Sequence, residues 1–154
     1  LPFADHSLAG VIGLDAFDQH GVHLKTALTE SRRVLRTGGF LLLRVSAYPW
    51  LQSEHDRAFG TGRRCSAKEI RAALRQADLK IGRLTYANLL MLLPAIALRL
   101  AIMANLSSVE VQFSPARTLG AMLTAVLRAE AAVLRSVRFP AGLSIYALAQ
   151  KVAS

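Results

Sequence analysis

The sequence predicts an α/β fold with a parallel sheet, and three features of residues 30–50 support this prediction. The first is the end of an amphipathic helix, where positive charges oppose the helix dipole. These charges belong to Arg32, Arg33 and Arg36. The second is the pair Gly38 and Gly39, which can adopt the left-handed conformation that closes a helix. The third is the apolar run at 40–43, which lacks polar alternation and therefore indicates a strand covered on both faces.

The other elements follow from the spacing of apolar residues along the chain. We predict strands at 9–14, 40–45, 79–86 and 143–149, and helices at 22–36 and 66–77. In the second helix Ser66 and Glu69 have the spacing of a capping box. Ser114 and Pro115 are typical of the start of a further helix. The loop that begins at Ser46 lies at the carboxyl end of the sheet, where open α/β folds bind their ligands.

The composition excludes several classes of protein. Hydrophobic residues make up 53% of the chain and charged residues 19%, so the chain is not disordered. Cys65 is the only cysteine, which excludes an intramolecular disulfide and favours a reducing compartment such as the cytoplasm. The four histidines have no paired ligand, so we predict no metal site. The length of 154 residues suits one domain.

The formal charge of +9 is concentrated in residues 57–85, which hold eight Lys or Arg against Glu69 and Asp78. A basic patch of this kind can attract nucleic acid, anionic lipid or an anionic substrate. A solvated, arginine-rich face is the simpler interpretation and the one we favour. Aromatic residues are sparse in this stretch, which argues against a base-stacking surface. Nucleic acid therefore ranks last among the partners we consider.

From residue 87 to residue 106 the chain is almost entirely apolar, interrupted by Pro94 and Arg99. A membrane span needs about 20 apolar residues with few charges, and these two residues leave only short runs. A helix buried against the sheet, or one that lies at a membrane surface, fits better. The predicted division is a sheet part and a helical insertion, at 1–86 with 143–154 and at 87–142. Glu130 lies on an apolar stripe of the insertion, so we expect a structural ion pair with an arginine, or snorkelling.

Several stretches of the chain resemble a class I S-adenosylmethionine-dependent methyltransferase, in particular the broad group that includes the ubiquinone and menaquinone methyltransferases. They read LPFADHSLAGVIGLDAF from Leu1, ESRRVLRTGGFLLLRV from Glu30 and AYPWLQSEHD from Ala47. In that family the first stretch leads into the fourth strand and the second into the fifth, with a proline where this chain has Thr37. The ending FPAGLSIYALAQK resembles the family's last strand, which is antiparallel. The order and spacing of these motifs extend the resemblance over nearly the whole chain.

The resemblance implies a Rossmann-like methyltransferase sheet that lacks its first three strands, has an antiparallel last strand, and carries an inserted pair of hydrophobic helices. The family binds S-adenosylmethionine through a glycine-rich turn after the first strand and an acidic residue at the end of the second. The 154 residues of this sequence contain neither feature. Gly60-Thr61-Gly62 is no substitute, because no apolar strand precedes it. We therefore expect a fragment or a truncated relative of the family, which holds only part of the cofactor site and is inactive by itself.

The resemblance also implies which residues contact the cofactor. These are Leu1, Pro2, Phe3, Leu14, Asp15 and Phe17. The first three can equally form a turn and a core anchor. Asp15 stands at the end of a strand, where a carboxylate can meet the cofactor's amino group or a substrate.

The candidates for catalysis are His20, Glu54 and His55, and those for the acceptor pocket are Asp18, Tyr48 and Trp50. A histidine titrates near neutral pH and can act as a general base, and aromatic side chains can line an apolar pocket. His20 has an alternative as a surface residue. The cluster from Tyr48 to His55 has an alternative as a loop fixed by Trp50, with its charges paired to Arg63 or Arg64. Cys65 and Ala9 depart from the family pattern, where relatives have tyrosine and aspartate.

Two functions remain open at this point. One is methyl transfer from S-adenosylmethionine to a small acceptor, with the apolar stretch suggesting a lipid-like acceptor and peripheral contact with a membrane. The other is a non-catalytic half-domain that binds a partner protein through its sheet edge, or binds a membrane. The acceptor, the atom that is methylated and the oligomeric state do not follow from the sequence.

Overall fold

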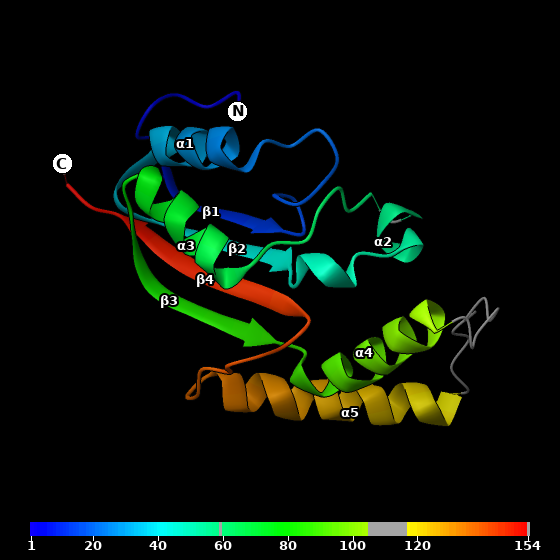
Figure 1. Ribbon diagram of the computed structural model, residues 1–154. Helices are drawn as coiled ribbons and strands as arrows, with labels where there is room; N and C mark the ends of the chain where they lie inside the picture. Colours follow the sequence, from blue (N-terminus) through cyan, green and yellow to red (C-terminus); the bar gives the residue numbers. More distant parts are fainter. Residues whose placement is uncertain (59, 105–116, 154) are drawn as a thin grey trace. The chain divides into compact units, whose positions relative to one another are not determined.

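The computed structural model describes residues 1–58, 60–104 and 117–153, and Figure 1 shows the elements along the chain. The chain divides into two compact units. The sheet unit is Leu1–Thr85 with Ser144–Ser154, and the helical unit is Tyr86–Leu143. The predicted division has the insertion at 87–142.

Four strands form one sheet in the order β1-β2-β4-β3. The strands are β1 (Leu8–Leu14), β2 (Leu35–Ser46), β3 (Leu79–Ala87) and β4 (Ser144–Lys151). β1 and β2 are parallel, with Val11 opposite Leu41, whereas β4 is antiparallel to β2. The predicted α/β class and the antiparallel last strand are therefore confirmed.

Helices α1 (Leu24–Val34) and α3 (Ala67–Gln76) contact each other and pack on the same face of the sheet. The core lies between them and the inward side chains of the inner strands. Its largest fully buried apolar members are Leu28, Val34, Leu35, Leu41, Leu43, Val45, Cys65, Ile70, Leu74 and Ile145. Truncating one such leucine to alanine costs about 2–5 kcal/mol in comparable cores. This core therefore fixes the sheet and, with it, the loops at the sheet's carboxyl edge.

The opposite face of the sheet, here called the outer face, carries Ile12, Leu42 and Leu148, which lie opposite one another in the strand register. Ile12 is 62% exposed and Leu148 is 41% exposed. The prediction that the central strand is covered on both faces is therefore wrong for the part of the chain that the structure describes. The reason is that α1 and α3 both pack on the inner face.

The connection from α1 to β2 also differs from the prediction. α1 ends at Val34, and Leu35 is already extended. Gly38, with φ of +79°, lies inside β2 at an irregularity in the pairing with β1, and its carbonyl accepts a hydrogen bond from the Gln150 side chain at 2.9 Å. The glycine thus serves a bulge and does not close the helix. Arg32 and Arg33 occupy the last helical turn as predicted.

The helical unit contains α4 (Leu89–Met103) and α5 (Arg117–Leu134), which lie side by side in Figure 1. Glu130 of α5 is buried, and its carboxylate accepts hydrogen bonds from the backbone N–H groups of Leu89 at 3.1 Å and Leu90 at 3.5 Å. The described residues therefore supply backbone groups, and no arginine, as partners of this carboxylate. The carboxylate accepts from N–H groups that the first turn of α4 leaves without a helical partner. Its negative charge also interacts favourably with the positive end of the helix dipole.

No described helix is long and apolar enough to cross a membrane. The predicted helix start at Ser114 and Pro115 lies outside the described residues.

Candidate functional site

The loops that follow β1 and β2 are joined by backbone hydrogen bonds at the carboxyl edge of the parallel pair. The second loop contains the 3-10 turn η1 (Pro49–Leu51) and the short helix α2 (Glu54–Ala58). The N–H of His20 donates to the carbonyl of Gly60 at 3.0 Å, and the N–H of Gly62 donates to the carbonyl of Asp18 at 2.8 Å. These bonds hold the two loops as one surface.

Asp18 connects the two loops from inside. Its side chain is completely buried, and Oδ2 accepts a hydrogen bond from the N–H of Ser46 at 2.7 Å. Its carbonyl accepts from the N–H groups of Gly62 at 2.8 Å and Arg63 at 3.2 Å. Oδ1 is buried and has no hydrogen-bond partner among the described residues. Among the described residues Asp18 therefore holds the two loops together and offers no exposed side-chain surface.

Gly62 allows this close approach of the two loops. A Cβ at this position would lie 2.9 Å from both the N and the Cα of His20. Any larger residue would therefore push the segment around Gly62 away from the loop after β1.

Asp15 stands directly after β1 in the left-handed region, with φ of +53°. Its Oδ2 accepts from Nη1 of Arg44 at 2.8 Å, and both side chains are about one third exposed. Arg44 also reaches the Ser144 hydroxyl and lies 6.0 Å from the centre of the Tyr146 ring. Burial raises the pKa of Asp15, Arg44 opposes this rise and Asp18 adds to it. The site therefore holds a reachable carboxyl that binds a proton more tightly than an ordinary aspartate.

A buried ion pair fixes α2 to the end of β2. Arg64 donates from Nε and Nη2 to the two carboxylate oxygens of Asp56 at 2.8 and 2.7 Å, and from Nη1 to the carbonyl of Ala47 at 3.1 Å. Asp56 also accepts from the N–H of Ser53 at 2.8 Å. Burial by itself would raise the pKa of Asp56, but these hydrogen bonds outweigh it and the pKa is lowered.

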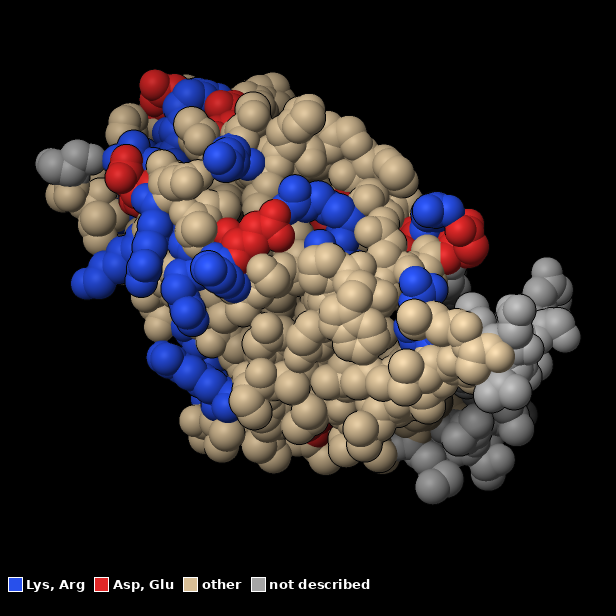
Figure 2. Space-filling view, viewed as in Figure 1, with Lys and Arg blue, Asp and Glu red and all other residues tan. Residues whose placement is uncertain are grey.

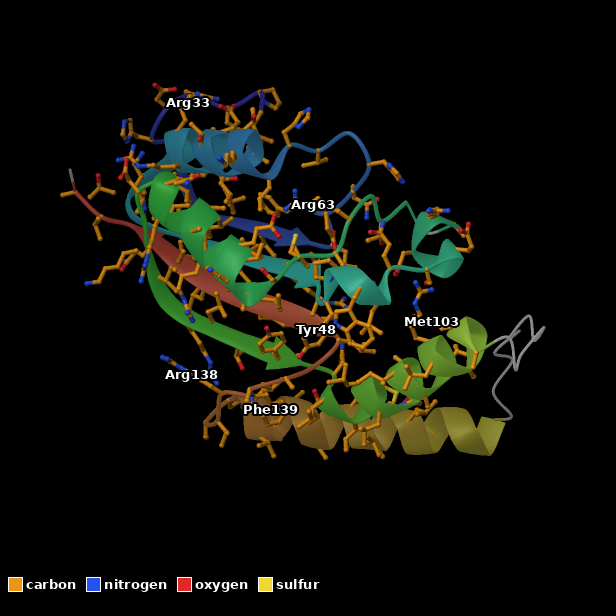
Figure 3. The ribbon with its side chains drawn as sticks, in the orientation of Figure 1. Arg33, Tyr48, Arg63, Met103, Arg138 and Phe139 are labelled. Atoms are coloured by element: carbon orange, nitrogen blue, oxygen red, sulfur yellow. The ribbon has the colours of Figure 1, made fainter. Side chains whose placement is uncertain are left out.

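Arg63 links the same loop to α3 (Figure 3). Its guanidinium pairs with Glu69 and lies 3.5 Å from the sulfur of Cys65. Burial raises the pKa of the Cys65 thiol, and Arg63 opposes the rise, so this cysteine is a core residue. Ser66 caps α3 as predicted by accepting from the N–H of Glu69. The Glu69 carboxylate pairs with Arg63.

The aromatic candidates lie next to each other on the surface. Tyr48, labelled in Figure 3, follows the end of β2 and has a positive φ of 60°. Its ring centre lies 6.2 Å from that of Trp50, at an interplanar angle of 49°. Trp50 is 51% exposed. This pair can form one wall of an open apolar surface.

No hydrogen bond or ion pair joins the catalytic candidates His20 and Glu54 in the part of the chain that the structure describes. His20 is exposed at the loop after β1. The Glu54 side chain is 85% exposed and pairs with Arg57 of the same helix, and not with Arg63 or Arg64. The side chain of His55 lies outside the described part of the structure. No cluster of metal-binding side chains occurs among the described residues.

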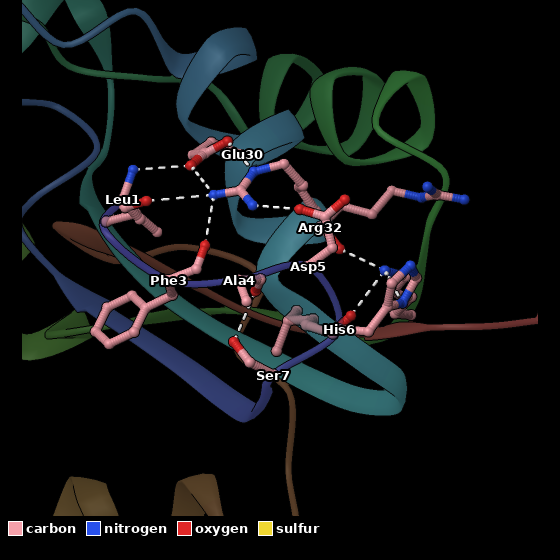
Figure 4. A network of polar contacts seen from close by, with 11 residues as sticks. Leu1, Phe3, Ala4, Asp5, His6, Ser7, Glu30 and Arg32 are labelled. Carbon is pink, nitrogen blue, oxygen red and sulfur yellow. Dashed lines mark hydrogen bonds and ion pairs between the residues drawn. The ribbon is translucent and has the colours of Figure 1, made fainter.

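Arg33 holds the N-terminal segment on α1, and Figure 4 shows this network of polar contacts with Leu1, Phe3, Asp5 and Glu30 labelled. Arg33 pairs with Asp5 and Glu30, and donates to the carbonyls of Phe3 at 2.9 Å and Leu1 at 3.2 Å. The hydrogen bond from Arg33, followed by one from the terminal amine, lowers the pKa of Glu30 to about 2. These contacts leave the Leu1 and Phe3 side chains 58% and 48% exposed, with Pro2 exposed between them.

The remaining cofactor candidates differ in exposure. Leu14 is 54% exposed at the end of β1, whereas Phe17 is 6% exposed. A Cβ at Gly13 would lie 2.2 Å from the Phe17 ring, so this ring packs on the strand and is a core anchor. Sequence reasoning did not single out Arg44, although a charged residue inside an otherwise apolar strand was a visible signal.

No protein-family model and no curated protein matches the chain. Solved structures do match it. A SAM-dependent methyltransferase from Thermotoga maritima aligns with 98% of this chain and 59% of its own, at 16% identity and a TM-score of 0.57. The geranyl diphosphate C-methyltransferase of Streptomyces coelicolor A3(2) aligns with 99% of this chain and 50% of its own, at 17% identity and a TM-score of 0.54.

This chain has a methyltransferase fold. It spans little more than half the length of the structures that it matches. The same fold also occurs in the [4+2]-cyclase SpnF, which aligns with all of this chain and 54% of its own at 20% identity and a TM-score of 0.55. The likeness therefore establishes the architecture and leaves the reaction to be argued from the site.

Proposed function

We propose that this chain forms the acceptor-facing part of an S-adenosylmethionine-dependent methyltransferase. Its acceptor is a small molecule, and this class includes lipid-like molecules. The observation that carries the proposal is the reachable group of Leu14, Asp15 and His20 at the carboxyl edge of the parallel strands, in a fold shared with such enzymes over the whole chain. This edge is where open α/β sheets bind their ligands.

The residues present fit one end of the cofactor. Leu14 offers exposed apolar surface, and Asp15 offers a carboxylate whose Oδ1 has no partner among the described residues, which suits an ammonium group. When bound, the cofactor supplies an electrophilic methyl group on a sulfonium sulfur. The chain would orient the acceptor and exclude water. A carboxylate or imidazole at this edge, Asp15 or His20, would take the proton that an acceptor hydroxyl or amine releases.

The outer face of the sheet suits the part of the fold that these residues do not contain. Its apolar row of Ile12, Leu42 and Leu148 lies beside the free edge of β1, which has one neighbour among the described strands. Parallel sheets are normally covered on both faces. We infer that the cofactor-binding half of a methyltransferase, with the three strands and the glycine-rich turn, pairs with β1 and covers this face.

The test compares the 154-residue chain with the protein expressed from the whole reading frame that encodes it. Calorimetry measures S-adenosylmethionine binding, and tritium transfer from the labelled methyl group into a small-molecule and lipid extract measures catalysis. We expect binding and transfer only in the larger protein, with His20→Ala lowering the transfer rate about 100-fold and Asp15→Asn weakening cofactor binding. A Lys25→Ala variant, exposed at the start of α1, is the control and should leave both unchanged.

Two results would contradict the proposal. Equal cofactor affinity in the two proteins would show that the site is complete without further residues. A larger protein that binds no S-adenosylmethionine would favour the rival function, a non-catalytic half-domain that uses the edge of β1 for a partner protein. The edge of β1, which has one neighbour among the described strands, is the observation that keeps this rival open.

A further inference from the structure

A second row of side chains crosses the outer face of the sheet at its carboxyl edge. Leu14, Arg44 and Tyr146 lie opposite one another in the strand register. Arg44 follows Leu42 by two residues, so this row points to the same side as the apolar row of the outer face. In Figure 2 many of the cations gather over α3 and β3, whereas Arg44 lies between an apolar and an aromatic side chain. A cation placed in this surrounding needs specific partners.

Two contacts hold Asp15 beside Arg44. The backbone N–H of Asp15 donates to the carbonyl of Arg44 at 3.0 Å, and the carboxylate Oδ2 accepts from Nη1 at 2.8 Å. The Asp15 and Arg44 side chains are 40% and 32% exposed, so a small molecule can reach both. A negative and a positive group therefore lie side by side in a fixed arrangement, which we call the Asp15–Arg44 pair.

The Asp15–Arg44 pair has hydrogen-bonding capacity to spare. A guanidinium has five N–H donors; Nη1 of Arg44 donates to Asp15, and Nε and Nη2 donate to the Ser144 hydroxyl at 3.4 and 3.3 Å. One N–H of Nη1, one N–H of Nη2 and Oδ1 of Asp15 have no partner among the described residues. The covering layer proposed for the outer face would keep water from these groups, and a buried polar group without a partner is costly. A ligand that offers an acceptor to Arg44 and a donor to Asp15 removes this cost.

We infer that the Asp15–Arg44 pair binds the zwitterion of an α-amino acid, with the ligand's carboxylate on the guanidinium and its ammonium group on Oδ1 of Asp15. The planar fork of a guanidinium matches a carboxylate. Leu14, which is 54% exposed, offers apolar surface for the ligand's carbon atoms. A ligand with a single charge fits less well, because an anion would also meet the aspartate and a cation would also meet the arginine.

Two molecules of the proposed reaction can carry this zwitterion, and the inference rests on the proposed function for that choice. One is S-adenosylmethionine, whose methionyl end is an α-amino acid. The other is an acceptor that is itself an amino acid. Both present the same two charged groups to the pair, so the experiment must distinguish the two sources.

Calorimetry on the protein expressed from the whole reading frame compares S-adenosylhomocysteine with 5′-methylthioadenosine, which shares the nucleoside but lacks the amino-acid end. If the cofactor is the source, Arg44→Gln should weaken S-adenosylhomocysteine binding about 30-fold and leave the affinity for 5′-methylthioadenosine unchanged. Arg44→Lys keeps the charge but loses the fork, so its loss should be smaller. The matched control is Arg36→Gln at the other end of β2, where the arginine is exposed; it should leave both affinities unchanged.

Free L-methionine separates the two sources in the same protein. L-methionine that competes with S-adenosylhomocysteine assigns the pair to the cofactor, whereas L-methionine that binds beside saturating S-adenosylhomocysteine assigns it to an amino-acid acceptor. In both cases binding should require Arg44. N-acetyl-L-methionine lacks the ammonium group and L-methionine methyl ester lacks the carboxylate, so both should bind more weakly than L-methionine.

Two results overturn the inference. One is an equal loss of affinity for both nucleosides in Arg44→Gln, which would make Arg44 a support of the sheet edge alone. The other is that neither S-adenosylhomocysteine nor L-methionine depends on Arg44. A protein that binds neither nucleoside contradicts the proposed function instead, and the dependence of L-methionine binding on Arg44 then still decides the inference.

Discussion

Replacing Asp56 by asparagine tests whether the loop after β2 is held by its buried ion pair. The Asp56 and Arg64 side chains are 7% and 14% exposed, and two hydrogen bonds of 2.7 and 2.8 Å join them. Removing one partner of a buried pair costs about 3–5 kcal/mol. Asparagine keeps the shape and one acceptor oxygen, so we expect the free energy of unfolding to fall by about 2–3 kcal/mol.

The matched control is Glu54→Gln in the same helix. The Glu54 and Arg57 side chains are 85% and 64% exposed, and exposed pairs contribute about 0–1 kcal/mol. Urea unfolding followed by Trp50 fluorescence is the appropriate assay, because Trp50 is the only tryptophan and reports on the sheet unit alone. Equal losses in the two variants would refute the importance of the buried pair.

The pH dependence gives a second check on Asp56. Its pKa in the folded protein lies below the ordinary value of 3.8, so the stabilising contribution is complete above that value and is lost as the pH falls through the lower folded pKa. The difference between the unchanged protein and Asp56→Asn should therefore be constant near neutral pH and shrink in acid. A difference that persists undiminished in acid would show that the carboxylate charge is not its source.

Three further predictions follow from single contacts. Glu130→Ala should lower the stability of the helical unit by about 1.5–3 kcal/mol because the first turn of α4 loses a charged acceptor, whereas Arg128→Ala on the same helix should cost under about 0.5 kcal/mol by thermal unfolding followed by circular dichroism. Gly62→Ala should cost about 1–3 kcal/mol by forcing the two site loops apart, while Gly82→Ala, whose Cβ would lie 3.6 Å from its nearest neighbour, should be neutral or slightly stabilising in the same urea assay. The carboxyl carbon of Asp15 should titrate above 3.8 by NMR, since its pKa is raised; its contribution to stability is then largest below 3.8 and decreases as the pH rises through the folded value. An Asp15 titration at or below 3.8 would contradict the burial of that carboxyl.

The fold was predictable because its signals are local. The apolar runs at 9–14 and 40–45 and the cap at Ser66 depend on neighbouring residues, and the structure confirms them. Gly38 was harder, because a glycine with positive φ serves a helix end and a strand bulge equally well. Only the pairing of β2 with β1 distinguishes the two.

The site was less predictable because its contacts join residues far apart in the sequence. Asp18 was selected as a substrate contact, yet its carboxylate accepts from the N–H of Ser46, 28 residues away, from inside the loops. Glu130 was expected to pair with an arginine, but its partners are backbone groups 40 and 41 residues earlier. A sequence shows which side chains are polar, whereas the choice among their possible partners depends on the tertiary arrangement.

The apolar residues on the outer face of β2 are not explained by the contacts of the described residues. Leu41 and Leu43 are fully buried against the helices, while Leu42 faces the outer side between Ile12 and Leu148. A strand with one permanently wet face would carry polar residues at the intervening positions. The apolar outer row therefore indicates a second covering layer, and the free edge of β1 provides the backbone groups to which further strands can pair. The proposed cofactor-binding half would both cover the outer face and pair with the edge of β1. A partner that pairs only with the edge would leave Leu148 exposed.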